Sequence, residues 1–147
     1  TMNINDAAYI AGLFDGEGTV EYKRYWEKRK KRKYYVWRIV MAIAMSDESV
    51  IRWVHEVLGV GTVAVIDKSK APTGKSYYKK QWRWRCSFRG AYYVAKIIWP
   101  YAQVKLHKIE QIIDHYQPDP DLKNNVVSLE EARIQRNYKN NPWHNLL

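Results

Sequence analysis

The sequence predicts an α+β domain whose helices and strands follow the order α-β-β-α-β-β-α. Three observations support this fold class. Residues 81–88 alternate apolar and polar side chains with the period of a half-buried β-strand. Residues 50–58 instead repeat apolar side chains at helical spacing, between a Ser-Asp-Glu-Ser cap and a glycine. The charged segment 27–32 separates two extended segments, which predicts a hairpin with a charged tip.

The first helix is predicted to begin after Asn5 or Asp6, because either side chain can cap a helix N-terminus. It is predicted to end at Gly16 or Gly18, where helical spacing gives way to an extended segment. Glu17 therefore lies at a junction between two elements, a place where proteins often hold reactive groups.

Four strands are predicted from their alternation and from the turn residues between them. Their ranges are 18–26, 33–44, 61–66 and roughly 76–88. In the fourth strand the apolar face consists of Trp82, Trp84, Cys86 and Phe88. Because side chains alternate along a strand, its remaining polar residues should face solvent.

The later helices are predicted at residues 46–58, 91–99 and 104–116, the last two being separated by Pro100. A Pro-rich linker follows, and Ser128 to Glu131 have the capping-box spacing of a final helix. The sequence thus predicts one domain at residues 5–117, with a linker and helical extension at residues 118–147.

Composition favours a polyanionic partner. The 147 residues include 25 Lys and Arg against 15 Asp and Glu, a formal net charge of +10, and nucleic acid is the leading candidate for such a balance. An anionic membrane surface is the competing partner. A membrane partner is disfavoured because the chain has no run of about 20 apolar residues and no basic amphipathic helix. A protein that binds structured RNA by shape is a third possibility.

Cys86 is the only cysteine, which excludes an intrachain disulfide and a zinc site built on paired cysteines. The four histidines are scattered without metal-ligand spacing. Because a single cysteine suits a reducing compartment and no secretion signal is visible, we expect an intracellular protein of a prokaryotic cytoplasm or an organelle. Carboxylate-bound Mg²⁺ remains open.

Residues 10–18 read Ile-Ala-Gly-Leu-Phe-Asp-Gly-Glu-Gly. Ala8, Gly12 and Gly16 are four residues apart, so they line one helical stripe on which a second backbone could approach closely. The alternative is that the stripe packs inside one subunit and that the two acids belong to a solvated turn.

The nonapeptide resembles the signature of the LAGLIDADG homing endonucleases. The resemblance implies that Glu17, at the position of the final acid, is a metal ligand, with the Gly16 carbonyl as a second ligand. It also implies that Asp15 is structural and satisfies backbone donors near the helix end. The family folds the α-β-β-α-β-β-α order around a curved four-stranded antiparallel sheet, so the resemblance covers most of residues 5–117.

The resemblance further implies a sequence-specific endonuclease that uses Mg²⁺, or another divalent cation such as Mn²⁺, to hydrolyse both strands of a long pseudo-palindromic DNA site. Members with one motif per chain act as homodimers, and such enzymes promote insertion of their intron or intein. The implied dimer interface consists of Ala8, Gly12, Asp15 and Gly16. Neither a membrane nor a small-molecule substrate is expected. The alternative is a non-cleaving nucleic-acid binder on the same scaffold, such as an intron RNA maturase or a DNA-binding regulator.

Two further catalytic residues are expected from the family pattern. Lys105 follows Pro100 at the start of a late helix and would stabilise charge at the phosphate; the alternative is a surface lysine. Many relatives carry a Gln at the end of the second strand to hold a water. This sequence has Ser46 and Asp47 there instead, and either could orient water.

DNA contacts are expected from the sheet, because a two-stranded ribbon fits the major groove and alternate side chains face the bases. The predicted base-facing residues are Glu21, Lys23, Tyr25, Tyr34, Arg38, Gln81, Arg83 and Arg85. The predicted phosphate-contacting residues are Lys28, Arg29, Lys30, Lys31, Arg32, Lys33, Lys68 and Lys70. A solvated charged loop is the alternative for the basic run. Most aromatic side chains should fill the core, with single-strand stacking left open for exposed tyrosines.

Overall fold

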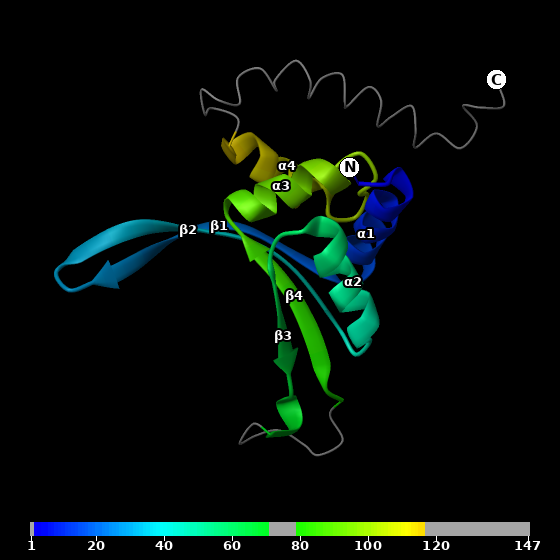
Figure 1. The fold of residues 1–147 in the computed structure, drawn as a ribbon. Coiled ribbons are helices and arrows are strands. Elements are labelled where there is room, and N and C mark those ends of the chain that lie inside the picture. Colours follow the sequence, from blue (N-terminus) through cyan, green and yellow to red (C-terminus); the bar gives the residue numbers. More distant parts are fainter. Residues whose placement is uncertain (1, 71–78, 117–147) are drawn as a thin grey trace, which may run out of the picture.

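The computed structural model describes residues 2–70 and 79–116, and these form the predicted α+β fold (Figure 1). The elements are α1 (Ile4–Glu17), β1 (Gly18–Arg29), β2 (Arg32–Met45), α2 (Glu48–Leu58), β3 (Thr62–Ile66), the 3-10 turn η1 (Lys68–Lys70), β4 (Gln81–Ser87), α3 (Arg89–Ile98) and α4 (Leu106–Tyr116). The strands form one antiparallel sheet in the order β1-β2-β4-β3. The predicted linker and final helix, and residues 76–78 of the predicted fourth strand, lie outside the described residues.

Helix α1 begins earlier than predicted. Its cap is Asn3, whose side-chain oxygen accepts a hydrogen bond from the Asn5 backbone N–H at 2.8 Å, so the prediction of Asn5 or Asp6 as the cap is wrong. The segment offers three capping residues, Asn3, Asn5 and Asp6, and the use of the first one starts the helix two or three residues earlier. At the other end, a Cβ on Gly18 would lie 2.6 Å from the Phe14 Cα, so only glycine lets β1 leave the helix at this angle.

The β1–β2 hairpin is longer than the predicted strands. Its register continues to the pair Arg29 and Arg32, so only Lys30 and Lys31 form the turn, and the predicted tip at residues 27–32 is too wide. Lys30 adopts a positive φ of 54°, as a tight turn requires. Neither face of this end of the hairpin is buried, and for that reason its strands lack the alternation that marks half-buried strands.

The core lies between one face of the sheet and helices α1 to α4, which cover only that face (Figure 1). Trp84 is completely buried and meets Phe14 of α1 edge to face at 5.8 Å between ring centroids. Its indole N–H donates to the Val60 carbonyl at 2.8 Å, which satisfies the polar atom of a buried ring. Cys86 is buried beside it, and burial raises the pKa of its thiol to about 12.

Phe88 does not belong to the predicted apolar face. Strand β4 ends at Ser87, and Phe88 adopts a positive φ of 52° where the chain turns into α3. Its side chain is 52% exposed as a result. None of the helices in the described part of the chain is long and apolar enough to cross a lipid bilayer.

None of the described helices covers the second face of the sheet (Figure 1). In Figure 1 the β1–β2 hairpin extends well past the helices in one direction, and β3 and β4 extend in another. The start of β1, where α1 ends, pairs with the segment of β2 that also pairs with β4, so the end of α1 lies near the centre of the sheet. This geometry leaves an open surface of strand residues next to the position of Glu17.

Candidate functional site

The first part of the site is the C-terminal end of α1. Glu17 is the last residue of the helix, and its side chain is exposed where β1 begins. None of the described residues forms a hydrogen bond or ion pair with its carboxylate. Gly16 beside it is exposed as well. Both oxygens of this carboxylate are therefore available to a ligand.

Asp15 joins this helix end to a distant segment. One carboxylate oxygen accepts the Gln103 backbone N–H at 2.9 Å, and the other accepts the Lys105 backbone N–H at 3.1 Å. The Lys105 carbonyl in turn accepts the Ile109 N–H at 3.1 Å, so Lys105 sits at the start of α4. Asp15 thus satisfies backbone donors near the end of α1, and it anchors the Lys105 backbone to a side chain that lies two residues before Glu17 on the helix. The carboxylate that was predicted for a dimer interface is engaged inside the subunit.

The small-residue stripe lies on the surface of the subunit. Gly12 and Gly16 are exposed, and a Cβ built on either would meet no heavy atom within 4 Å among the described residues. Ala8 is half-buried. In this part of the chain the two glycines therefore do not serve packing inside the subunit, which was the alternative explanation of the stripe.

The end of β2 lies close to the end of α1, because the register pairs Gly18 with Ile43. Ser46 follows the strand and is exposed. Asp47 caps α2: its Oδ1 accepts the Val50 N–H at 3.2 Å and the Ser49 hydroxyl at 2.7 Å. These hydrogen bonds, the hydroxyl's first, lower the pKa of Asp47. One oxygen of the residue predicted to orient water is thus occupied by capping.

A single subunit does not assemble a complete metal site from its described residues. Across residues 2–70 and 79–116, no group of three or more His, Cys, Asp or Glu side chains could hold a metal ion. The Glu17 carboxylate and the Gly16 carbonyl are oxygen donors, the kind that Mg²⁺ prefers. They offer only part of the coordination shell that this ion needs.

The open face of the sheet is the second part of the site. The strand register places all of the predicted base-facing residues on this face: Lys23 opposite Arg38, Glu27 opposite Tyr34, Ala42 opposite Arg85, Ala44 opposite Arg83, and Ile66 opposite Gln81. The face carries cations from β1, β2 and β4, next to the end of α1. It can therefore contact a polyanion across β1, β2 and β4.

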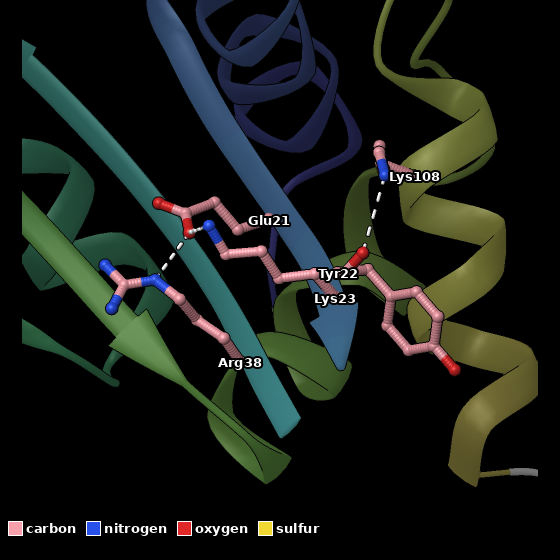
Figure 2. A network of polar contacts seen from close by, with 5 residues as sticks. All are labelled: Glu21, Tyr22, Lys23, Arg38 and Lys108. Carbon is pink, nitrogen blue, oxygen red and sulfur yellow. Dashed lines mark hydrogen bonds and ion pairs between the residues drawn. The ribbon is translucent and has the colours of Figure 1, made fainter. Parts of the chain in front are cut away.

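Glu21 organises the cations at the centre of this face. The Arg38 Nε donates to the Glu21 Oε2 at 2.5 Å, and the Lys23 Nζ lies 3.8 Å from the same oxygen (Figure 2). The hydrogen bond from Arg38 is the main cause that lowers the pKa of Glu21. Figure 2 also shows the alternation of β1, since the Tyr22 ring lies on the opposite side, beside α4.

Two features of this surface were not predicted. The Arg83 Nε is buried and has no hydrogen-bond partner among the described residues, which leaves a donor in need of an acceptor. The basic run is also divided between the two faces. Arg29 and Arg32 lie on the open face, where Arg29 pairs with Glu27 at 3.1 Å, whereas Lys28 and its partner Lys33 lie on the helix side.

Lys30 and Lys31 form the hairpin turn, with all residues from 28 to 33 exposed. Lys68 is exposed in η1, and Lys70 belongs to the same turn at the far end of the sheet. Cations therefore stand at both ends of the open face. The prediction did not separate the open-face cations from the helix-side ones, because the predicted strands left residues 27–32 unassigned to either face.

No protein-family model matches the chain, and no curated protein sequence matches it. Solved structures are similar in fold. The homing endonuclease I-CvuI in complex with its target, in the presence of calcium, is 18% identical with a TM-score of 0.59 over 91% of this chain and 79% of its own. The group I intron-encoded homing endonuclease I-CeuI in complex with DNA is 12% identical with a TM-score of 0.59, over 90% of this chain and 62% of its own.

The I-SmaMI LAGLIDADG homing endonuclease bound to cleaved DNA is 14% identical, with a TM-score of 0.54 over 89% of this chain and 42% of its own. The described elements, from the helix that carries the nonapeptide to the open antiparallel sheet, match those of these proteins. The chain has the fold of the LAGLIDADG homing endonucleases.

Proposed function

We propose that this protein is a sequence-specific DNA endonuclease that cuts both strands of a pseudo-palindromic site as a homodimer with divalent metal. The observation that carries the proposal is the unpartnered Glu17 carboxylate at the end of an exposed glycine stripe. The I-CvuI, I-CeuI and I-SmaMI structures of the same fold hold DNA. Cleavage inside a cell would promote insertion of the intron or intein that encodes the protein.

The exposed stripe supports the dimer. Gly12 and Gly16 leave room for a second backbone at the helix surface, and a copy packed there by two-fold symmetry would meet the same stripe. The two Glu17 carboxylates would then arrive side by side, each aimed at one strand of the duplex. A two-fold protein matches a site whose halves are related by two-fold symmetry.

A paired site also answers the shortage of ligands in one subunit. Two Glu17 carboxylates and two Gly16 carbonyls supply oxygen donors from both copies, while Mg²⁺ takes its remaining ligands from phosphate and water. Bound there, the metal would supply an activated water and stabilise charge on the phosphate. We regard Mg²⁺ as the physiological ion and Mn²⁺ as a substitute.

The other residues near Glu17 have separate tasks in this proposal. Lys105, held at the start of α4 by the Asp15 carboxylate, would bring positive charge to the scissile phosphate. Ser46, exposed at the end of β2, would orient the attacking water through its hydroxyl, with the free oxygen of Asp47 beside it. Each of these groups acts on the substrate without itself being consumed.

The open face would provide binding and sequence choice. Arg38 is held by Glu21 in a fixed orientation, which suits bidentate contact with a guanine, and Gln81 can read an adenine. Contacts from the hairpin tip and from Lys68 and Lys70 to phosphates would add affinity that falls with salt.

A second function has one observation in its favour. At the end of β2 the chain carries Ser46 and Asp47 in place of an amide, and Asp47 uses one oxygen to cap α2. A site without a dedicated water-binding side chain fits a protein that binds nucleic acid without cutting it. Such a protein would act as an RNA maturase or as a DNA-binding regulator.

A nicking assay with Mg²⁺ on a randomised duplex library separates the two functions. We expect cleavage by the wild-type protein and binding without cleavage by Glu17→Gln, because the amide keeps the shape of the side chain and loses its charge. Glu56→Gln, an exposed acid on α2, is the matched control and should cut normally. Equal cutting by the wild type and Glu17→Gln would remove Glu17 from the mechanism, and binding without cutting by the wild type would favour the second function.

A further inference from the structure

The β1–β2 hairpin carries a second distinctive surface on the side of the sheet that faces the helices. Its register pairs Trp26 with Tyr35, Lys28 with Lys33, and Arg24 with Trp37. These side chains share the face of Tyr22, which lies beside α4 (Figure 2). The hairpin continues past the helices (Figure 1). We call this surface the hairpin platform; it consists of Arg24, Trp26, Lys28, Lys33, Tyr35 and Trp37.

The aromatic rings of the platform are ordered against one another and remain exposed. The Trp26 and Tyr35 ring centroids are 3.5 Å apart with 32° between the planes, although the two residues are 56% and 50% exposed. The Arg24 guanidinium lies 4.0 Å from the Tyr35 ring centroid and 5.6 Å from that of Trp37. A cross-strand ring pair stabilises a hairpin, but that role does not require the neighbouring cations.

The platform is also positively charged. Arg24, Lys28 and Lys33 are exposed, and no carboxylate among the described residues forms an ion pair with them. The opposite face differs, because Glu21 and Glu27 there neutralise part of the charge. Burial is the main cause that raises the pKa of Tyr22, and the negative charge of Asp114 on α4 raises it further.

Aromatic contacts extend inward from the platform. The Trp37 ring meets His115 of α4 at 4.6 Å between centroids, and His115 meets Tyr116 at 4.9 Å. The Arg24 guanidinium, which lies over both the Tyr35 and the Trp37 rings, connects the exposed ring pair to these packed rings beside α4.

We propose that the hairpin platform binds an unpaired strand of DNA, on the face of the hairpin opposite to the duplex. Exposed rings with interleaved cations are the arrangement that holds single strands, because every base can stack and every phosphate can be neutralised. Neither contact needs a 2′-hydroxyl. The choice of DNA rests on the proposed function, which places a duplex against the other side of the same two strands.

The test measures fluorescence anisotropy of a labelled oligo(dT) of about 12 nucleotides, within the site size of single-strand binding modules. Trp26→Leu and Tyr35→Leu remove platform rings, and Arg24→Gln removes a cation with little expected effect on folding. Tyr25→Leu and Tyr34→Leu are the matched variants, because these tyrosines are 41% and 46% exposed on the opposite face of the same hairpin. Circular dichroism checks the fold of each variant. A blunt random-sequence duplex and an oligo(rU) of equal length complete the set.

We expect the platform variants to bind oligo(dT) about tenfold more weakly, in line with the loss of one stacked base, and to bind the duplex as the wild type does. The opposite-face variants should weaken duplex binding and leave oligo(dT) binding unchanged. Equal oligo(dT) affinity in the wild type, Trp26→Leu and Arg24→Gln would overturn the proposal. Binding of oligo(rU) about tenfold tighter than oligo(dT) would overturn the assignment to DNA. Absence of duplex cleavage alone would count against the proposed endonuclease function and not against single-strand binding by the hairpin platform.

Discussion

The Asp15 carboxylate and the Lys105 backbone N–H form a 3.1 Å hydrogen bond across 90 residues of sequence. The second oxygen accepts Gln103 N–H at 2.9 Å, so the carboxylate bridges two donors of the segment that leads into α4. Asp15 precedes Glu17 by two residues on α1. One side chain therefore fixes the position of Lys105 relative to Glu17, which makes Asp15 a positioning residue.

Replacing Asp15 with Asn should uncouple these two groups. An amide can accept from only one of the two N–H donors and presents its own NH₂ to the other, so we expect a loss of about 1–2 kcal/mol in the free energy of unfolding. Cleavage should fall while DNA binding is retained, because the open face of the sheet is untouched. Urea unfolding and single-turnover cleavage measure the two effects, with Glu56→Gln as the control. Wild-type cleavage by Asp15→Asn would contradict the positioning role.

Substitution of the glycine stripe should separate dimer formation from folding. A Cβ at Gly12 meets nothing within 4 Å in the described structure, so Gly12→Leu should fold and gain about 0.5–1 kcal/mol from its better helix propensity. The larger side chain would keep a second helix away. Analytical ultracentrifugation should then find a monomer and cleavage should be lost. Glu56→Leu places the same side chain on exposed α2 and should leave the dimer intact; a stable dimer of Gly12→Leu would count against the proposed interface.

The sequence predicted the fold where burial leaves a pattern. Strand β4 alternates because Trp84 and Cys86 face the core while Arg83 and Arg85 do not. The outer half of the hairpin has no buried face, and its strands were therefore predicted too short. Phe88 was placed in the core because it continues the alternation of Trp84 and Cys86, and the positive φ that turns it outward leaves no trace in the sequence.

In the candidate site, too, local features could be predicted from the sequence and long-range contacts could not. The position of Glu17 at the end of a helix followed from the nonapeptide, because a local motif encodes a local structure. The bond between Asp15 and Lys105 could not be predicted, since any exposed-looking carboxylate can accept a backbone N–H and the donor is far away in sequence. The unpartnered Arg83 Nε likewise depends on which strands lie beside β4.

Glu21 should limit non-specific binding. It holds Arg38 through the 2.5 Å hydrogen bond and attracts Lys23, and its own negative charge repels phosphate. We expect Glu21→Gln to tighten binding to random-sequence DNA and to steepen the salt dependence of binding by about one phosphate contact. The variant should also relax the base preference at the position that Arg38 contacts. Anisotropy titrations at several salt concentrations measure the first two effects, and selection from a duplex library measures the third. Unchanged salt dependence would show that the Arg38 guanidinium does not reach the DNA.

His115 should make the stability of the domain depend on pH. Its ring packs against Trp37 at 4.6 Å and its Nδ1 lies 3.1 Å from the Tyr22 hydroxyl, and burial lowers its pKa from the usual 6.5. A histidine with a lowered folded-state pKa binds fewer protons than the unfolded chain below pH 6.5. Stability therefore rises with pH through the interval between the folded-state and unfolded-state pKa values, and it is lost as the pH falls through that interval.

The measurement is urea unfolding of the wild type, His115→Gln and His107→Gln from neutral to mildly acidic pH. The wild type and His107→Gln should lose stability in parallel on acidification, since His107 is exposed on the same helix. His115→Gln should be less stable at neutral pH, because it loses the ring contacts, and should show a flatter pH profile. A slope equal to that of the wild type would mean that His115 takes up its proton as readily in the folded chain as in the unfolded one, and that its packing between Trp37 and Tyr116 costs the charged form nothing.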